Sequence, residues 1–469
     1  VDKVDGAIKK MTDQNPNIEI DEMRKKFEER KNIIEKKKLE ESNITYDEYL
    51  EEMKKTIKSK NVHFNYKERE QYRKEYGDRI PDRVNVLETM NEDDKTYGCF
   101  SGCTSFTAIT IPDSVTSIRA CCFRDCTSLK SINIPGSVKS IGESCFENCS
   151  LLTSIDISSS VTSIGSRCFK GCNSLKSINI PSSVSSIGEH CFDECKKLIT
   201  ISIPSSVSSI GSGSFHNCKS LMGIDIPISI NSIGEHCFHG CSSLTYIKIP
   251  DSVSSIGVWC FHGCCSLTLI TKPSGVTRIG KCSLRYCSSL KSINIPSRVS
   301  SIEVGTFGCC SSLISIDISS SVTSIGSRCF KGCNSLTSID IPSSVKSIDK
   351  ECFTGCSSLT SINIPSSVSS LSMGCFRCCE SLTSINIPSS VTSIGSRCFK
   401  GCNSLTSIDI PSSVKSIGKY CFYNCKSLKS ITIPKVYKER IEDIQNKDNL
   451  FKNQKGDGEK PEECKLTYI

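Results

Sequence analysis

The sequence VTSIGSRCFKGCNSLKSINIP, residues 161–181, returns with small changes along most of this chain. Its phenylalanine recurs every 23 residues at fifteen positions from Phe100 to Phe422, with Leu284 as the one substitution and no insertion or deletion. A fixed period of about 20 to 50 residues is typical of solenoids, in which a repeat buries its apolar face only by stacking on its neighbours. The sequence therefore predicts a solenoid, whose function depends on its surfaces.

Within one repeat, the first predicted element is a short strand. Leu175, Ile178 and Ile180 follow Phe169, and the two isoleucines share one face because side chains alternate along a strand. Pro181 then ends the strand and begins a turn. Equivalent strands would stack in parallel and form a sheet on one face of the solenoid.

The other side of the repeat is predicted to contain one or two helical turns in residues 166–172. Cys168, Phe169 and Cys172 lie at i, i+1 and i+4, so one helical face can carry them into the core. Gly171 would close the turn in a left-handed conformation. We thus expect an α/β repeat solenoid with a parallel sheet on one face and short helical turns or loops on the other.

The flanking segments differ from the repeats, which we assign to residues 96–434. Residues 1–95 are rich in Glu, Lys and Arg and predict a charged helical segment, with one helix in residues 20–39 and another from Thr45, where Glu48 completes a capping box. They could be solvated helices or a module that binds a partner. Residues 435–469 are predicted to form a C-terminal cap and polar tail, with the cap in residues 435–451.

Composition and motifs exclude several classes of function. The formal net charge of +8 is spread over 469 residues, unlike the concentrated basic surface of a nucleic-acid-binding protein. No window is long and apolar enough to insert into a membrane. The chain has six histidines and no glycine-rich phosphate loop, and its prominent Ser, Cys and Asp residues follow the period. We therefore expect neither an enzyme nor a bound cofactor.

The repeats resemble the BspA-like leucine-rich repeats, a 23-residue class found in bacterial and protozoan surface proteins. The last full repeat shows the residues that carry this resemblance: Leu405, Ile408, Ile410, Pro411, Val414, Ile417, Gly418, Phe422 and Cys425. One departure is the small residue before the phenylalanine, typically Ala in the family, which is Cys in twelve repeats here, including Cys398. The resemblance implies a curved solenoid that binds proteins or mediates adhesion at a cell surface, without catalysis.

Cysteine is unusually abundant, with 33 residues. One column, which includes Cys172 and Cys425, is filled in all fifteen repeats, and the column before the phenylalanine is Ser214, Ser283 or Thr306 in the three repeats without Cys. Zinc sites and disulfides are alternatives, but we favour buried thiols that donate to strand or turn carbonyl groups. Such thiols indicate a reducing compartment, in tension with a surface location.

A polar column should line the exposed sheet face, between the buried isoleucines. It would bind an extended partner or simply be solvated. Its members are Asn133, Asp156, Asn179, Ser202, Asp225, Lys248, Thr271, Asn294, Asp317, Asp340, Asn363, Asn386 and Asp409.

Three consecutive repeats interrupt this polar face. The neighbouring column, which is almost all serine, becomes Gly223, Tyr246 and Leu269 there. An aromatic and an aliphatic side chain on a polar sheet are typical of a binding patch. The predicted partner-binding site comprises Asp225, Tyr246, Lys248, Leu269, Thr271 and Lys272.

Histidines form a second anomaly, on the side of the predicted helical turns. His216, His239 and His262 directly follow the phenylalanine position in three successive repeats, so their rings should stack about 5 Å apart. Trp259 and His236 should lie nearby. Such a ladder could hold a metal or sense pH, but we favour ordinary variation at an exposed position and predict no metal site.

Three hypotheses follow. The first is a non-catalytic protein-binding solenoid, a surface adhesin that binds a host or cell-surface protein through its sheet face. The second is an intracellular scaffold with a helical N-terminal partner-binding module, favoured by the many thiols and by the lack of a visible signal peptide. The third, a metal-binding or thiol redox protein, has less support.

Overall fold

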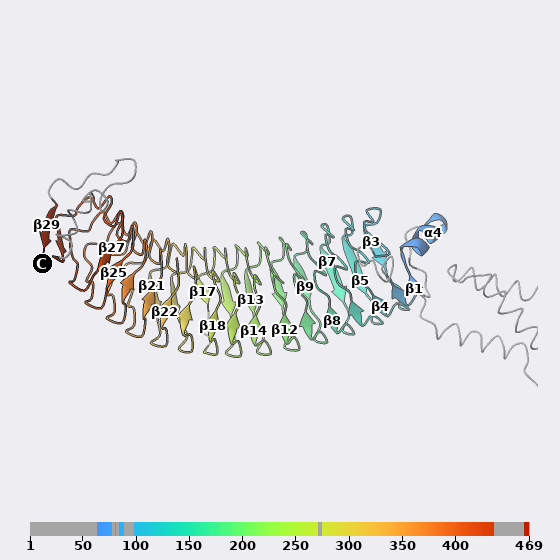
Figure 1. The fold of residues 1–469 in the computed structure, drawn as a ribbon. Coiled ribbons are helices and arrows are strands. Elements are labelled where there is room, and N and C mark those ends of the chain that lie inside the picture. Colours follow the sequence, from blue (N-terminus) through green and yellow to red (C-terminus); the bar gives the residue numbers. More distant parts are fainter. Residues whose placement is uncertain are drawn as a thin grey trace, which may run out of the picture. The chain divides into compact units, whose positions relative to one another are not determined.

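The computed structural model describes residues 63–76, 80, 84–88, 98–270, 274–435 and 464–468. The chain divides into two compact units, an N-terminal unit, Val1–Val184, and a C-terminal unit, Ser185–Ile469. Within each unit, successive repeats form rungs whose strands pair in parallel with the equivalent strands of the next rung (Figure 1). The fold is a parallel β-solenoid built from leucine-rich repeats.

A typical rung has two strands rather than the one expected from the sequence. The longer strand coincides with the predicted Leu-x-x-Ile-x-Ile run. The second has two residues and ends in a buried isoleucine or leucine. Its backbone pairs with the same strand one repeat away, as between Ser140–Ile141 and Ser163–Ile164.

In the N-terminal unit the longer strands are β3 (Ala108–Thr110), β5 (Ser131–Ile134), β7 (Ser154–Ile157) and β9 (Ser177–Asn179). The short strands are β4 (Ser117–Ile118), β6 (Ser140–Ile141) and β8 (Ser163–Ile164).

In the C-terminal unit the longer strands are β11 (Thr200–Ser202), β13 (Gly223–Asp225), β15 (Tyr246–Lys248), β17 (Leu269–Ile270), β19 (Ser292–Asn294), β21 (Ser315–Asp317), β26 (Ser407–Asp409), β28 (Ser430–Ile433) and β29 (Lys465–Tyr468). The short strands are β10 (Ser186–Ile187), β12 (Ser209–Ile210), β14 (Ser232–Ile233), β16 (Ser255–Ile256), β18 (Arg278–Ile279), β20 (Ser301–Ile302), β22 (Ser324–Ile325), β23 (Ser347–Ile348), β24 (Ser370–Leu371), β25 (Ser393–Ile394) and β27 (Ser416–Ile417).

The helical turns predicted in residues 166–172 are wrong, and the alternative of loops is confirmed: this segment consists of turns, and the repeats are β rather than α/β. The backbone hydrogen bonds explain why. The Phe146 N–H donates to the Cys168 carbonyl one repeat away at 2.8 Å, instead of to a residue four positions earlier. Arg167 and Gly171 both have positive φ, 54° and 73°, which interrupts right-handed helical geometry twice within five residues. The predicted left-handed Gly171 is confirmed.

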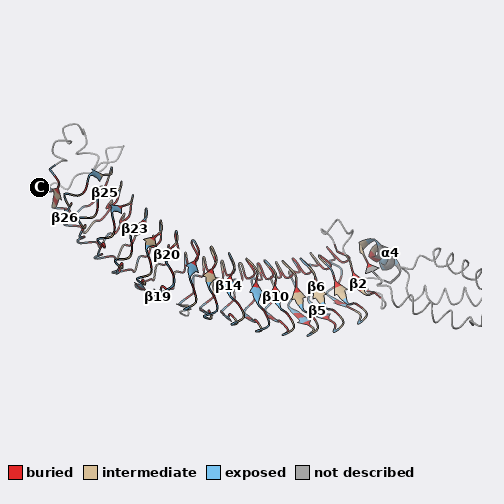
Figure 2. Cartoon of the chain, turned by 60° about the horizontal axis from the view of Figure 1, so that its bottom comes forward, coloured by how far each residue is buried: buried red, intermediate tan, exposed pale blue. Residues whose placement is uncertain are grey.

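The core consists of the columns that the period identifies. Along β7 burial alternates, so Ile155 and Ile157 are buried and Ser154 and Asp156 are exposed. Figure 2 shows buried and exposed residues following one another along the rungs. Phenylalanine rings of adjacent rungs stack, with 5.3 Å between ring centres and 2° between ring planes for Phe123 and Phe146. Burying one such ring contributes about 1.5–3 kcal/mol.

The N-terminal flank closes the first rungs of its unit. Strand β1 (His63–Phe64) pairs with β2 (Val86–Leu87), which pairs with β4. The ring of Phe64 lies 6.1 Å from that of Phe100, and the buried guanidinium of Arg69, from helix α4 (Tyr66–Tyr76), lies 5.3 Å from the Phe100 ring. These side chains cover the open end of the phenylalanine stack.

The description of residues 1–95 as a helical segment is not supported. Their described part holds one helix, α4, and the two strands β1 and β2, which extend a sheet. Phe64 and Leu87 in these strands are buried and take the place of the apolar residues of a preceding repeat. The helices predicted in residues 20–39 and from Thr45 lie outside the described residues.

At the other end of the repeats, a strand closes the sheet of the C-terminal unit. Strand β29 pairs in parallel with β28, with Leu466 opposite Ile431. Except for Lys435, the cap predicted in residues 435–451 lies outside the described residues. The sequence analysis did not foresee β29, since the Lys465–Tyr468 segment has none of the repeat's spacing.

Candidate functional site

The polar column lies where the sequence predicted, on the exposed face of the longer strands. In the strand registers Asn133 stands opposite Asp156, and Asn294 opposite Asp317, so these side chains form ladders. The nine Asn and Asp residues of the predicted ladder outside the interrupted repeats are all exposed: Asn133, Asp156, Asn179, Asn294, Asp317, Asp340, Asn363, Asn386 and Asp409. Their exposure is confirmed, and a binding role for them remains a prediction.

The interruption of this face becomes one continuous patch in the structure. Gly223, Tyr246 and Leu269 are direct partners in the register of β13, β15 and β17. The Tyr246 and Leu269 side chains are 48% and 61% exposed, so two large apolar groups face solvent side by side. A Cβ atom at Gly223 would lie within 2.2 Å of the Tyr246 ring, so glycine makes the room in which the ring lies against the backbone.

Charged and further apolar side chains border this patch. Asp225 and Lys248 are opposite one another in the same register and both are exposed. Met222, next to Gly223, is 56% exposed, and Ile199, whose carbonyl accepts from the Met222 N–H, is 40% exposed. The sequence analysis missed Ile199, which occupies the same repeat position as Met222 and could have been found by extending the comparison of columns by one residue. We call Met222, Tyr246 and Leu269 the apolar patch.

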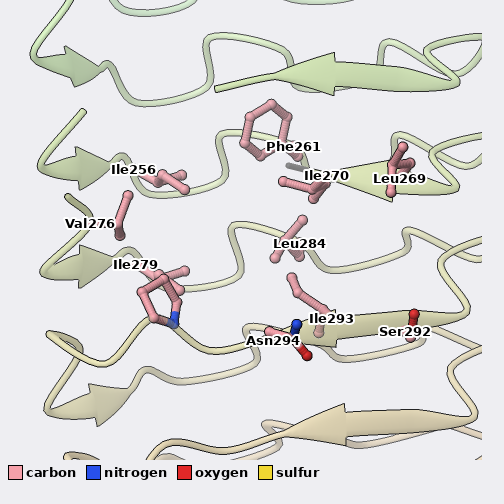
Figure 3. A pocket seen from close by; sticks show the side chains of 11 residues that line it. Ile256, Phe261, Leu269, Ile270, Val276, Ile279, Leu284, Ser292, Ile293 and Asn294 are labelled. Carbon is pink, nitrogen blue, oxygen red and sulfur yellow. The ribbon is translucent and has the colours of Figure 1, made fainter. Parts of the chain in front are cut away.

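Two predicted site residues, Thr271 and Lys272, lie outside the described residues. Beside the apolar patch, however, a cavity of about 150 Å³ separates β17 from β19 (Figure 3). Leu269 and Ile270 line it from one strand and Ile293 from the other, while Leu284 forms part of its inner wall. Leu284 is the one aliphatic residue in the phenylalanine column, and a smaller side chain there leaves the space open.

The histidine ladder has the predicted spacing. Ring centres lie 5.0 Å apart for His216 and His239 and 4.6 Å apart for His239 and His262, and the rings meet edge to face. The two nitrogens of His239 are each 3.1 Å from another imidazole nitrogen, Nδ1 from that of His236 and Nε2 from Nδ1 of His262. Trp259 packs 4.4 Å from His262, between ring centres.

Burial and neighbouring charges disfavour the protonation of three of these histidines, His236, His239 and His262. Burial, and then the charges of His262, His216 and His236, lower the pKa of His239 to about 4. Burial followed by the charge of His216 lowers the pKa of His236, and burial followed by Arg285 lowers that of His262. Among the described residues, no group of three or more His, Cys, Asp or Glu side chains is placed to hold a metal ion. His236, His239 and His262 are thus uncharged near neutral pH, whereas His216 Nδ1 lies 2.7 Å from a carboxylate oxygen of Asp193.

The cysteine column after the phenylalanine forms a second ladder, inside the core. The Sγ atom of Cys172 donates to the carbonyl of Phe146 at 3.2 Å, and Cys356 donates to Phe330 at 3.1 Å in the other unit. Burial raises the pKa of Cys356 to about 12, so the thiol keeps its proton. In the other column, Ser214 Oγ donates to the Gly188 carbonyl at 2.9 Å. The predicted donation to carbonyl groups is confirmed.

The family pattern described as BspA type Leucine rich repeat region (6 copies) matches residues 96–222, 209–337 and 323–455. The chain belongs to the BspA-type leucine-rich repeat family. This confirms the resemblance drawn from the repeat residues. Families of this kind are typically non-enzymatic protein-interaction modules.

Solved structures of other leucine-rich repeat proteins are similar to this chain. A leucine-rich repeat protein from Bacteroides ovatus is 30% identical and covers 84% of this chain and 100% of its own, with a TM-score of 0.70. One from Eubacterium ventriosum is 23% identical over 63% of this chain and 82% of its own, with a TM-score of 0.46. A leucine rich cell surface protein from Faecalibacterium prausnitzii is 26% identical over 70% and 87%, with a TM-score of 0.41.

No curated protein matches the chain. Among the described residues of this BspA-type protein, no helix has the length and apolar character needed to cross a membrane.

Proposed function

We propose that this BspA-type solenoid is a surface adhesin that binds a protein partner through the sheet face of β13, β15 and β17. The observation that carries the proposal is the apolar patch, in which Tyr246 and Leu269 stand exposed in register on a face that is mainly serine, asparagine and aspartate in the other repeats. Exposed tyrosine with adjacent aliphatic groups is the composition found at the centre of protein interfaces.

The surroundings of the patch supply the other parts of an interface. Asp225 and Lys248 place one charge of each sign at its border, which favours a partner segment of complementary charge order. The cavity between β17 and β19, lined by Leu269 and Ile293, has room for one apolar side chain of that partner. An anchor in a pocket beside exposed aromatic groups is how a few residues come to dominate binding energy.

The test uses the residue that most repeats place at these positions. The double variant Tyr246→Ser/Leu269→Ser restores serine in the column, so it should leave folding intact. Binding of the purified chain to intact animal cells and to immobilised extracellular-matrix proteins is then measured. We expect at least tenfold weaker binding, since two interface anchors contribute about 1–2 kcal/mol each.

The matched control is Ser131→Ala/Ser154→Ala, which changes the same column in the N-terminal unit. It should bind as the unmodified chain does. If the unmodified chain binds none of these surfaces, the adhesin proposal fails. If it binds and the Tyr246→Ser/Leu269→Ser variant binds equally well, the assignment to the apolar patch fails.

An intracellular scaffold is the second candidate, and one observation favours it. Thiols such as Cys172 and Cys356 act as hydrogen-bond donors, which requires that they stay reduced. Biotinylation of intact cells separates the two candidates: labelling of this protein supports the adhesin, and its protection until the cells are lysed supports the scaffold.

A further inference from the structure

Two segments of the C-terminal unit, residues 322–348 and 391–417, have identical sequences over 27 positions. Each carries one arginine and two lysines, and the arginine and the first lysine are three residues apart, Arg328 and Lys331 in the first copy and Arg397 and Lys400 in the second. Both arginines have a φ of 58°, so the backbone presents them in the same way. Any difference between the copies therefore comes from the rungs beside them.

In the first copy an acidic neighbour forms ion pairs with both cations. Glu351, one repeat after Arg328, accepts from Arg328 Nε at 2.9 Å and from Lys331 Nζ at 3.5 Å. The hydrogen bond from Arg328 is the main cause that lowers the pKa of the Glu351 carboxyl group. In this copy Glu351 therefore offsets part of the positive charge of Arg328 and Lys331.

In the second copy the position of Glu351 belongs to Tyr420. The Arg397 guanidinium carbon lies 5.7 Å from the centre of the Tyr420 ring, and Lys400 Nζ lies 4.5 Å from that of Tyr423. Aromatic rings attract cations but leave their net charge in place. The second copy thus keeps both positive charges.

A third cation joins them from the preceding rung. Arg377 stands one repeat before Lys400, where the first copy has Gly308. Its Nε atom is buried and lacks a hydrogen-bond partner within the described residues. Burial, and then the charges of Arg377 and Arg397, lower the pKa of Lys400, so both guanidinium groups act on the Lys400 ammonium group.

The structure records no ion pair for Arg377, Arg397 or Lys400 within the part of the chain that it describes. The surrounding sequence is basic as well, since residues 377–429 hold seven Lys and Arg but only Glu380 and Asp409 as acids. Arg377 and Lys400 are half-buried and Arg397 is exposed. Repulsion among neighbouring cations costs free energy that a bound anion would recover.

We propose that Arg377, Arg397 and Lys400 form a binding site for one sulfate or phosphate group, either as a free ion or as an ester. Guanidinium groups bind tetrahedral oxyanions through paired N–H donors, and an ammonium group adds a compact charge. The rung of Arg377 lies directly beside Lys400, whose carbonyl accepts from the Cys378 N–H at 2.7 Å, and Arg397 is three residues before Lys400. Three cations placed in this way suit a single doubly charged group. A long polyanion would need a continuous basic track, which Glu351 interrupts one rung before Arg377 and two rungs before Arg397.

The test is isothermal titration of the full chain with sodium sulfate and with sodium phosphate at low ionic strength. We expect one bound oxyanion. The variant Arg397→Gln/Lys400→Gln should bind at least tenfold more weakly. The control Arg328→Gln/Lys331→Gln removes the same charges from an identical sequence and should change the affinity less than twofold.

Further arms test the geometry and the source of the anion. Tyr420→Glu places a carboxylate where the first copy has Glu351, so it should also lower the affinity at least tenfold. Glucose 6-sulfate and glucose 6-phosphate distinguish the sources: tighter binding than the free ions supports a site for an ester, and equal or weaker binding supports a site for the ion. Absence of binding by the unmodified chain, or an equal loss in the control variant, would overturn the proposal.

Discussion

The segments 322–348 and 391–417 have the same sequence but different surfaces. Arg328 in the first copy is bound by Glu351, whereas Arg397 in the second lies over the ring of Tyr420. In a solenoid the nearest neighbours of an exposed side chain are the residues 23 positions before and after it. Residues in the adjacent rungs therefore determine what an exposed side chain can bind.

The interiors of the two copies are alike. The ring of Phe330 lies 5.4 Å from that of Phe353, and the ring of Phe399 lies 5.8 Å from that of Phe422. Cys333 and Cys402 each donate to the carbonyl of the residue 26 positions earlier, at 3.2 Å in both cases. The period determines the core, because every repeat brings the same residues to it.

The largest expected effects test this equality of the interiors. Phe330→Ala and Phe399→Ala each remove a fully buried ring and should each lower the free energy of unfolding by about 3–5 kcal/mol. Urea denaturation measures both. Values that differ by more than about 1 kcal/mol would show that the neighbouring rungs affect the core as well as the surface.

A smaller equal effect is expected for the thiols. Cys333→Ala and Cys402→Ala each remove one of two donors to a buried carbonyl, since the carbonyls of Phe307 and Phe376 also accept from the backbone N–H groups of Cys310 and Cys379. Loss of the thiol hydrogen bond should lower the free energy of unfolding by about 0.5–1.5 kcal/mol. Urea denaturation again provides the measurement. A neutral outcome in both variants would mean that these thiols only fill space.

Acid should destabilise the rungs that contain histidine more than the segments 322–348 and 391–417, which contain none. Because the pKa of His239 is lowered in the folded state to about 4, the folded chain binds fewer protons than the unfolded one. Stability near His239 should therefore fall as the pH drops from about 6.5 toward 4. Hydrogen exchange should accelerate there and not in residues 322–348; uniform acceleration would contradict the assignment.

The smallest effect concerns the ion network of the first copy. Glu351→Gln should cost about 0–1 kcal/mol, because Arg328 and Lys331 are largely solvated. The lowered pKa of Glu351 means that this contribution is present above the ordinary glutamate pKa and is lost as the pH falls below it. Glu351→Gln should thus matter at pH 7 and not at pH 3, and a loss that is the same at both would argue against the ion pairs.

The sequence predicted the core columns because every one of them repeats. Phe169, Ile178 and Ile187 are buried as the period required. It did not predict that Ser186–Ile187 is a strand, since a two-residue strand is too short for its period to be recognised. The prediction of helical turns was wrong because Arg167 has a positive φ, which interrupts a right-handed helix. Arginine has no preference for positive φ, so nothing in the sequence indicated this interruption.

The two candidate sites also differ in whether the sequence alone could predict them. Tyr246 and Leu269 could be identified from the sequence, as departures from a serine column whose exposure follows from strand alternation. The cluster of Arg377, Arg397 and Lys400 could not, because lysine and arginine are common at those positions and only their pairing with a neighbouring rung distinguishes them. Glu351 and Tyr420 had to be placed in space first.

The central claim is that adjacent rungs determine the chemistry of a repeat position. The double variant Gly308→Arg/Glu351→Tyr would give the first copy the arginine and the tyrosine that flank Arg397 and Lys400 in the second. Isothermal titration with sulfate measures how many ions the full chain binds. Our account predicts one ion more than for the unmodified chain, and an unchanged number would contradict it.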